Sequence, residues 1–245
     1  FSEMLWDAIR KDPISVRAFN YQETLAGVLE ELGESNMKQA LQTLRMSTIE
    51  GLLKNPKKIM NEELSTGDLY VALAQIEKEK KNEDHAIRLY VKAYDFYTNE
   101  LKRLGLDEKK NRGINFDRLY CLAKAKRFEE AEKKYLDLEK TYPDEFTFFY
   151  LHARMLKDQE KFDRSIEMAG RAFKLSYGEN RLRVAGFLSA LYAQVNQKEK
   201  AINIIDQTLV SIQVPEDKTS RLHKELAKLE AQKVIYQKEL NKQIK

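Results

Sequence analysis

The sequence predicts an all-α protein built as a solenoid, in which short helices stack on one another instead of closing around one core. Three observations lead to this prediction. Glycine and proline number only 9 and 4 among 245 residues, which leaves little material for hairpins. Charged residues make up 33 % and the mean hydropathy is -0.62, which is typical of thin packing with a large wet surface. Finally, one helix-turn-helix pattern recurs along the chain.

The recurring pattern is clearest in two stretches, "RFEEAEKKYLDLEKTYPDE" from Arg127 and "KFDRSIEMAGRAFKLSYGE" from Lys161, which align residue for residue at an offset of 161 − 127 = 34. Further copies are "KEKAINIIDQTLVSIQVPE" and, upstream, "EDHAIRLYVKAYDFY". Each copy follows another short amphipathic stretch, such as "FTFFYLHARMLKDQ". The repeating unit is therefore a helix, a tight turn and a second helix.

Small residues recur at fixed places in these units. A helix of about a dozen residues is marginal alone in water, so each helix needs neighbours. A small side chain lets two helices approach closely, and we expect such contacts at Ala74, Ala86, Ala131, Ala153, Ser165, Ser189 and Ala201. Pro143 closes one unit, because proline does not continue a helix.

This pattern resembles the tetratricopeptide repeat, a unit of 34 residues with small, aromatic and leucine residues at set positions. Four units match it, at 67–100, 112–145, 146–179 and 182–215, the second of them mainly in its second helix. The resemblance implies a right-handed α-solenoid. It is specific over 67–215, whereas 1–66 reads as degenerate helices of the same kind.

Several residues depart from the repeat pattern. His152 stands where leucine is usual, and Glu77 stands where tyrosine is usual. The small residues Ala86 and Ala131 are 131 − 86 = 45 apart instead of 34. The excess falls in "TNELKRLGLDEKKNRG" and predicts a lengthened helix followed by a longer connection.

The first 66 residues contain a weaker version of the pattern. "MLWDAIRKDP" reads as the closing half of a unit, with Leu5 and Ala8 in the repeat positions, so we expect the chain to start inside a repeat. A degenerate unit follows, with "LGES" as its turn and Ala40 near the small-residue position of its second helix.

The last segment, 216–245, carries leucines at spacings of three and four, as in Leu222, Leu226 and Leu229. One interpretation is a helix that caps the end of the solenoid, which such stacks require. The alternative is a coiled coil that associates two copies or leads to another domain. Lys233 lies in the apolar stripe and weakens the coiled-coil interpretation.

The sequence contains few of the residue patterns that indicate catalysis. The three histidines, His85, His152 and His223, lie far apart, and the chain has no glycine-rich phosphate loop and one cysteine, Cys121. We therefore expect no enzyme activity, no cofactor and no metal site. The net charge of +4 is spread along the chain, so no nucleic acid is expected as partner. No apolar run approaches the ~20 residues of a membrane span; the segment is predicted to be soluble, with the cytoplasm slightly favoured and the compartment otherwise unknown.

The resemblance implies that a partner binds the concave face, formed by the first helix of each repeat. Carried over position by position, this face includes Val71 and Gln75 and, as the candidate contacts, Tyr120, Lys124, Tyr150, Arg154, Asp158 and Arg183. Tyrosines interleaved with cations suit a peptide or helix of acidic and apolar character. The side chains with which some relatives clamp a chaperone's carboxylate tail are missing. The predicted function is a protein-interaction scaffold; the alternative is a regulatory or sensory domain of a larger protein that carries an enzymatic or DNA-binding domain.

Overall fold

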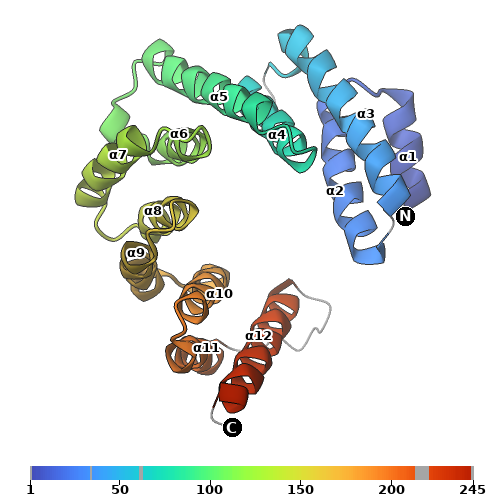
Figure 1. Cartoon of the computed structure of the whole chain (residues 1–245). Helices are drawn as coiled ribbons and strands as arrows, with labels where there is room; N and C mark the ends of the chain where they lie inside the picture. Colours follow the sequence, from blue (N-terminus) through green and yellow to red (C-terminus); the bar gives the residue numbers. More distant parts are fainter. Residues whose placement is uncertain (1, 34, 61–62, 213–220, 244–245) are drawn as a thin grey trace. The chain divides into compact units, whose positions relative to one another are not determined.

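A computed structural model describes residues 2–33, 35–60, 63–212 and 221–243, and these residues form twelve α-helices, two short 3-10 helices and no strand (Figure 1). The chain divides into two compact units, Phe1–Arg127 and Phe128–Lys245. The helices of unit 1 are α1 Ser2–Lys11, α2 Val16–Leu32, α3 Ser35–Lys54, η1 Pro56–Lys58, α4 Thr66–Glu79, α5 Glu83–Arg103, η2 Glu108–Lys110 and α6 Arg112–Lys124. Those of unit 2 are α7 Phe128–Thr141, α8 Phe146–Asp158, α9 Phe162–Leu175, α10 Gly178–Gln194, α11 Lys198–Ser211 and α12 Arg221–Gln243.

The same turn joins the two helices of four successive pairs. Lys81, Lys126, Glu160 and Asn196 each adopt the left-handed conformation, with φ between 57° and 61°. At each turn the amide of the next residue donates to a carbonyl five residues back, as from Lys161 to Leu156 (3.0 Å), which caps the first helix. The turns are spaced by 45, 34 and 36 residues (126 − 81, 160 − 126, 196 − 160). The predicted helix-turn-helix repeat is confirmed, and the first spacing carries the predicted extra length.

Small residues lie at the contacts between paired helices, as the repeat predicts. Ala74 and Ala86 are buried where α4 meets α5, and Ala153 and Ser165 are buried where α8 meets α9. The Ser165 hydroxyl donates a hydrogen bond of 2.7 Å to the Ala153 carbonyl, so these two helices approach to direct backbone contact. A larger side chain at either position would force the pair apart. The all-α solenoid of tetratricopeptide-like helix pairs is confirmed.

The α1–α3 region of unit 1 has its own small core, formed by Leu5, Ile9, Leu25, Leu29 and Leu41. The sequence prediction for Ala40 is wrong, because Ala40 is exposed while the adjacent Leu41 is buried. Polar side chains larger than alanine lie between α2 and α3 instead. The Gln22 amide donates to the Thr48 hydroxyl at 2.9 Å, and both residues are buried. This pair of helices therefore buries a polar contact where the repeat usually buries a small residue.

The predicted lengthening after the first clear repeat is present. The second helix of that repeat, α5, runs for 21 residues, and a connection containing η2 follows it. The buried Arg118 guanidinium of α6 donates to the Glu108 carboxylate of η2 (2.8 Å) and so holds η2 against α6. It also donates to the Thr98 hydroxyl of α5 (3.1 Å). The Asn115 amide donates to the Glu108 carbonyl as well.

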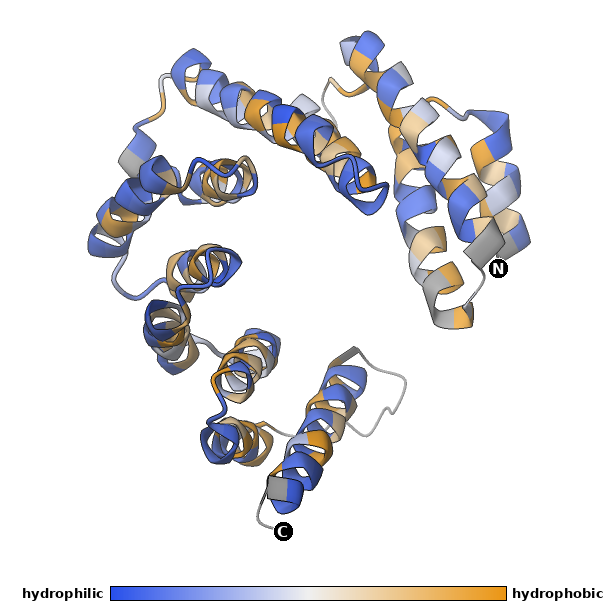
Figure 2. Ribbon diagram, viewed as in Figure 1, coloured by the Kyte–Doolittle hydropathy of each residue, from blue (hydrophilic) through white to orange (hydrophobic). Residues whose placement is uncertain are grey.

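Unit 2 arranges its paired helices in two layers, with the first helices α8 and α10 in one layer and α9 and α11 in the other (Figure 1). Each helix carries hydrophobic and hydrophilic residues (Figure 2), and the hydrophobic ones meet in a core that runs from Phe146 to α12. Leu226 and Leu229 of α12 are buried in that core. Two ion pairs add to the contact, Lys233–Asp206 (2.5 Å) and Lys198–Glu239 (3.5 Å).

The leucine stripe of α12 thus packs on its own chain, against α10 and α11, as a cap does. Lys233, which is out of place in an apolar stripe, pairs with Asp206 of α11. The end of the fourth predicted repeat (213–215) and residues 216–220 and 244–245 of the predicted C-terminal segment lie outside the described residues.

Candidate partner-binding site

Five side chains of unit 2 form a surface in which cations lie against aromatic rings. We call Tyr150, Arg154, Lys157, Arg183 and Phe187 the cationic surface. The Tyr150 and Phe187 rings meet edge to face at 5.5 Å. The guanidinium groups of Arg183 and Arg154 lie 5.3 Å and 5.8 Å from the centre of the Tyr150 ring, and the Lys157 ammonium lies 5.8 Å from that of Phe187.

Helix geometry explains why these residues meet. Tyr150, Arg154 and Lys157 are four and three residues apart on α8, so they share one helical face. Arg183 and Phe187 are one turn apart on the neighbouring first helix, α10. The Glu145 carboxylate fixes the start of α8, since it accepts a hydrogen bond of 3.1 Å from the Thr147 amide.

Among the described residues, no carboxylate neutralises the cations of this surface. Arg183 donates to the Asn180 amide oxygen at 2.9 Å, and within the described ranges Arg154, Lys157 and Arg183 form no ion pair with a carboxylate. Arg183 and Lys157 are exposed, whereas the Tyr150 ring is buried beneath them. A guanidinium group is built to bind a carboxylate with two parallel hydrogen bonds. The arrangement therefore favours an anionic group bound by the cations that lie over the aromatic rings.

The structure brings together three of the six residues predicted for partner contact, Tyr150, Arg154 and Arg183. Asp158 is the last residue of α8 and is exposed. Sequence reasoning missed Lys157 and Phe187, although a signal was present. Each continues the face of a predicted residue, at three residues from Arg154 and four from Arg183.

The other two predicted residues, Tyr120 and Lys124, lie on α6 in unit 1. The Lys124 ammonium is 5.9 Å from the centre of the Tyr120 ring, whose edge meets Tyr90. The Gln75 amide reaches the Tyr120 hydroxyl at 3.5 Å. Tyr120 thus belongs to a different setting from Tyr150, a cleft with acidic side chains.

This acidic cleft has a volume of about 310 Å³ and lies among α2, α4, α5 and α6. We define it by its lining residues: Phe19, Glu23, Asp68, Val71, Ala72, Gln75, Tyr97, Asp117 and Tyr120. Burial by the cleft walls, followed by the charge of Asp68, raises the pKa of the Asp117 carboxyl to about 6. Asp117 as a whole residue is nevertheless exposed, so solvent and solutes reach it.

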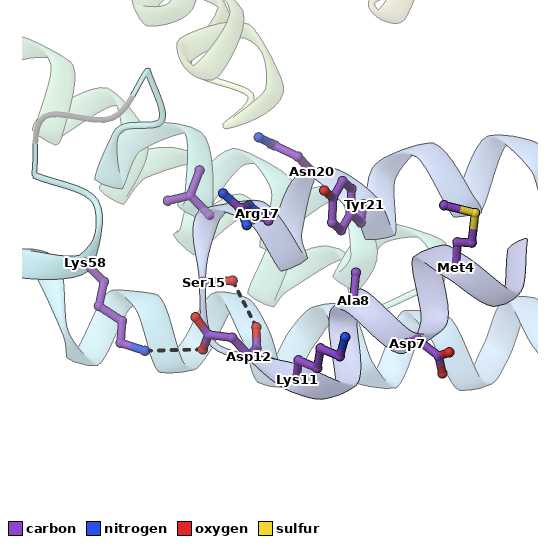
Figure 3. A pocket seen from close by; sticks show the side chains of 11 residues that line it. Met4, Asp7, Ala8, Lys11, Asp12, Ser15, Arg17, Asn20, Tyr21 and Lys58 are labelled. Carbon is purple, nitrogen blue, oxygen red and sulfur yellow. Dashed lines mark hydrogen bonds and ion pairs between the residues drawn. The ribbon is translucent and has the colours of Figure 1, made fainter. Parts of the chain in front are cut away.

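A larger cavity, of about 1030 Å³, opens between α1 and the start of α2 (Figure 3). Met4, Ala8 and Tyr21 contribute its apolar wall. Charged groups of both signs surround it, and one pair, Lys58 and Asp12, is in contact at 3.8 Å. Such a mixed wall favours no single class of ligand.

Two histidines are part of buried or partly buried structural pairs. His152 Nδ1 lies 2.7 Å from the Glu139 carboxylate, and the His152 ring stacks on Tyr135 at 5.1 Å, so the histidine at a leucine position is held by α7. His85 Nδ1 lies 3.2 Å from the buried Glu77 carboxylate. No group of three or more metal-ligating side chains occurs in the part of the chain that the structure describes.

The Glu77 carboxylate ties together the turn between α4 and α5. It accepts hydrogen bonds from Lys80 (2.9 Å) and Asn82 (2.7 Å). Burial by itself raises the pKa of Glu77, but the hydrogen bonds from Lys80, His85 and Asn82 outweigh it and leave the pKa lowered. Glu77 therefore has a structural role where the repeat usually places tyrosine.

Comparison with known proteins gives no family and no relative by sequence, because no family description and no curated protein matches the chain. Solved structures that it resembles include TTC0263, a thermophilic TPR protein of Thermus thermophilus, at 14 % identity, a TM-score of 0.47 and coverage of 87 % of this chain and 100 % of that one.

Two others are the assembly chaperone of RpL4, Acl4 (14 % identity, TM-score 0.46, covering 99 % and 90 %), and BtubC from P. vanneervenii (16 %, 0.42, covering 89 % and 91 %). The repeat fold rests on the period and the turn geometry of the chain itself. Among the described residues, no helix combines the length and the apolar character needed to cross a bilayer.

Proposed function

We propose that this chain is a noncatalytic protein-interaction scaffold and that its cationic surface binds a partner segment of acidic and apolar character. The observation that carries the proposal is the grouping of three cations over the Tyr150 and Phe187 rings, none of which pairs with a carboxylate in the described part of the chain. An interface needs aromatic contact area for affinity and charged groups for orientation, and this surface offers both.

The chemistry of the partner follows from the surface. Arg154 and Arg183 approach the same ring, so one carboxylate, or two on adjacent turns of a helix, would meet both guanidinium groups. An apolar side chain of the partner would cover the exposed part of Phe187. Asp158, the last residue of α8, belongs to the proposal as a predicted contact. Tyr120 and Lys124 on α6 of unit 1 stay separate predictions of partner contact, and self-association through α12 is a prediction too.

The test is a selection of short displayed peptides on the full chain, with counter-selection on the variant Arg154→Glu/Arg183→Glu. Both arginines are at least partly exposed, so this variant changes charge without removing core packing. Replacing Tyr150 would be a poorer choice, because its ring is buried in the unit 2 core.

Peptides that survive counter-selection are expected to combine Asp or Glu with Leu or Phe, and their affinity should fall as salt rises. Lys174→Glu/Lys161→Glu, on exposed positions in and beside α9, is the matched control for net charge. A selection that leaves no peptide after counter-selection, or leaves only peptides without Asp or Glu, would reject the cationic surface.

A further inference from the structure

The acidic cleft of unit 1 differs from the cationic surface in chemistry as well as in place. The nine described residues that line it include three carboxylates, those of Glu23, Asp68 and Asp117, and no lysine, arginine or histidine. Three aromatic rings, Phe19, Tyr97 and Tyr120, form most of the remaining wall. Aromatic faces and a carboxylate together are a setting that attracts a desolvated cation.

Two of the three carboxylates are already used by the fold. Glu23 forms an ion pair with Arg45 of α3. Asp68 accepts a hydrogen bond of 2.6 Å from the Tyr97 hydroxyl with one oxygen and one of 2.7 Å from the Ser65 amide with the other, which completes the cap at the start of α4. These contacts hold the two carboxylates in fixed positions in the wall.

The third carboxylate, that of Asp117, differs from the other two. In the described part of the chain it accepts no hydrogen bond and forms no ion pair, although it faces a cavity in which its charge is repelled by Asp68. A cation in the cleft would relieve that repulsion and would supply the partner that Asp117 lacks. The Gln75 amide and the Tyr120 hydroxyl line the same cleft and provide further polar contacts.

The size of the cleft limits the ligand. At about 310 Å³ it lies at the lower end of the range for small-molecule sites, so it suits a single side chain and not a large cofactor. A lysine or arginine side chain has the required form, because an aliphatic stem would pack against Val71, Ala72 and the rings while the cationic head reaches the carboxylate.

We propose that the acidic cleft of unit 1 receives a lysine or arginine side chain of a partner polypeptide, with Asp117 as its counter-ion. This second docking surface is independent of the cationic surface in unit 2, because it involves other helices and the opposite charge. Charge complementarity between the cleft and the side chain selects the occupant.

The probe is Nα-acetyl-lysine methylamide, titrated into the isotope-labelled full chain and followed by amide chemical shifts. Nα-acetyl-norleucine methylamide is the matched control, because it keeps the aliphatic stem and lacks the ammonium group. We expect saturable shifts at amides of Val71, Ala72, Asp117 and Tyr120 with the lysine compound, and weak or absent shifts there with the norleucine compound.

The variant Asp117→Asn keeps the shape of the side chain and removes its charge. It is expected to weaken binding of the lysine compound by about tenfold or more. Asp95→Asn, at an exposed position of α5 outside the cleft, makes the same change in net charge and should leave the affinity within about twofold. Circular dichroism of both variants checks that the helices are intact.

Equal binding of the two compounds, native affinity in Asp117→Asn, or shifts confined to amides outside the cleft would each overturn the proposal. None of these results depends on the cationic surface. The acidic-peptide selection on unit 2 and this titration on unit 1 therefore fail or succeed separately.

Discussion

The first helices of unit 1 and of unit 2 differ in charge at equivalent repeat positions. Counting from the predicted repeat starts at 67 and 182, Asp68 and Arg183 both occupy the second position. In the ninth position unit 1 has Gln75 and Tyr120, whereas unit 2 has Arg154. The repeat places these side chains on an accessible face, and their charge decides what that face attracts. The contrast separates what the fold determines from what individual residues determine.

The interiors of the two units differ in the same way. In unit 1 the repeat's usual tyrosine is replaced by Glu77, whose carboxylate is bonded by the residues of its own turn. In unit 2 the usual leucine is replaced by His152, which is bonded across the interface with α7 by Glu139. The unusual polar side chain thus finds its hydrogen-bond partners within its own turn in unit 1, and on a neighbouring helix in unit 2.

The largest expected effect tests the interior of unit 2. His152→Leu restores the usual repeat residue but leaves the Glu139 carboxylate buried without its partner, so the free energy of unfolding should fall by about 3 kcal/mol. Urea denaturation followed by circular dichroism measures it. Adding Glu139→Leu should recover most of the loss, because two apolar groups then replace the pair. A single variant as stable as the native chain would mean that the pair contributes nothing.

The second prediction tests whether the cationic surface and the acidic cleft bind their ligands independently. Arg154→Glu/Arg183→Glu should weaken a selected acidic peptide by about 100-fold, which corresponds to about 2.8 kcal/mol, because two cationic contacts become repulsive. Fluorescence anisotropy of the labelled peptide measures the change. Binding of the lysine compound to unit 1 should stay the same in this variant, and a parallel loss there would show that the two surfaces are not independent.

A third, smaller effect concerns Glu77. Because its pKa is lowered in the folded state, its contribution to stability is present above the ordinary value of 4.5 and is lost as the pH falls through the lowered folded pKa. Glu77→Gln should cost about 1.5 kcal/mol at neutral pH and should make unfolding less pH-dependent in that acidic window. Unfolding curves at several pH values for both proteins test this, and identical pH profiles would contradict it.

The smallest effect concerns Asp117, whose pKa of about 6 is raised above the ordinary 3.8. The folded state therefore holds the proton more tightly, and the contribution of Asp117 to stability falls as the pH rises from about 4 to 6. Glu23, Asp68, Tyr97 and Tyr120 face it across the cleft.

Only the ionised carboxylate attracts a cation, so affinity for the lysine compound should fall by up to about tenfold between pH 7 and pH 5. The titration repeated at both pH values measures the change. An affinity that is the same at pH 5 and pH 7 would show that the charge of Asp117 does not contribute to binding.

The repeat could be predicted from sequence because it depends on near neighbours in the chain. Small residues at Ala131 and Ser165, 34 apart, are enough to reveal the period, and the 11-residue excess before Ala131 predicted the longer α5 and its connection. Three of the four left-handed turns could not be predicted from residue type, since Lys81, Lys126 and Glu160 are not the glycine or asparagine that usually marks such a conformation.

Side-chain contacts between neighbouring helices were the part that could not be predicted. The pairing of His152 with Glu139 and the hold of Arg118 on Glu108 depend on which helical faces meet. Asp117 was not among the predicted contact residues, because a carboxylate on a helix is usually a solvated one. Ala40 shows the opposite error, in which a small residue fitted the period while its side chain faces solvent.

The most direct test of the account is a chemical-shift titration of the full chain with two peptides that are identical except that one carries glutamate and the other lysine at the charged positions between leucines. The account predicts that the glutamate peptide perturbs amides of α8 and α10 around Arg154 and Arg183, and that the lysine peptide perturbs amides of α4 and α6 around Asp117. Perturbation of the same amides by both peptides, or the reverse pattern, would contradict it.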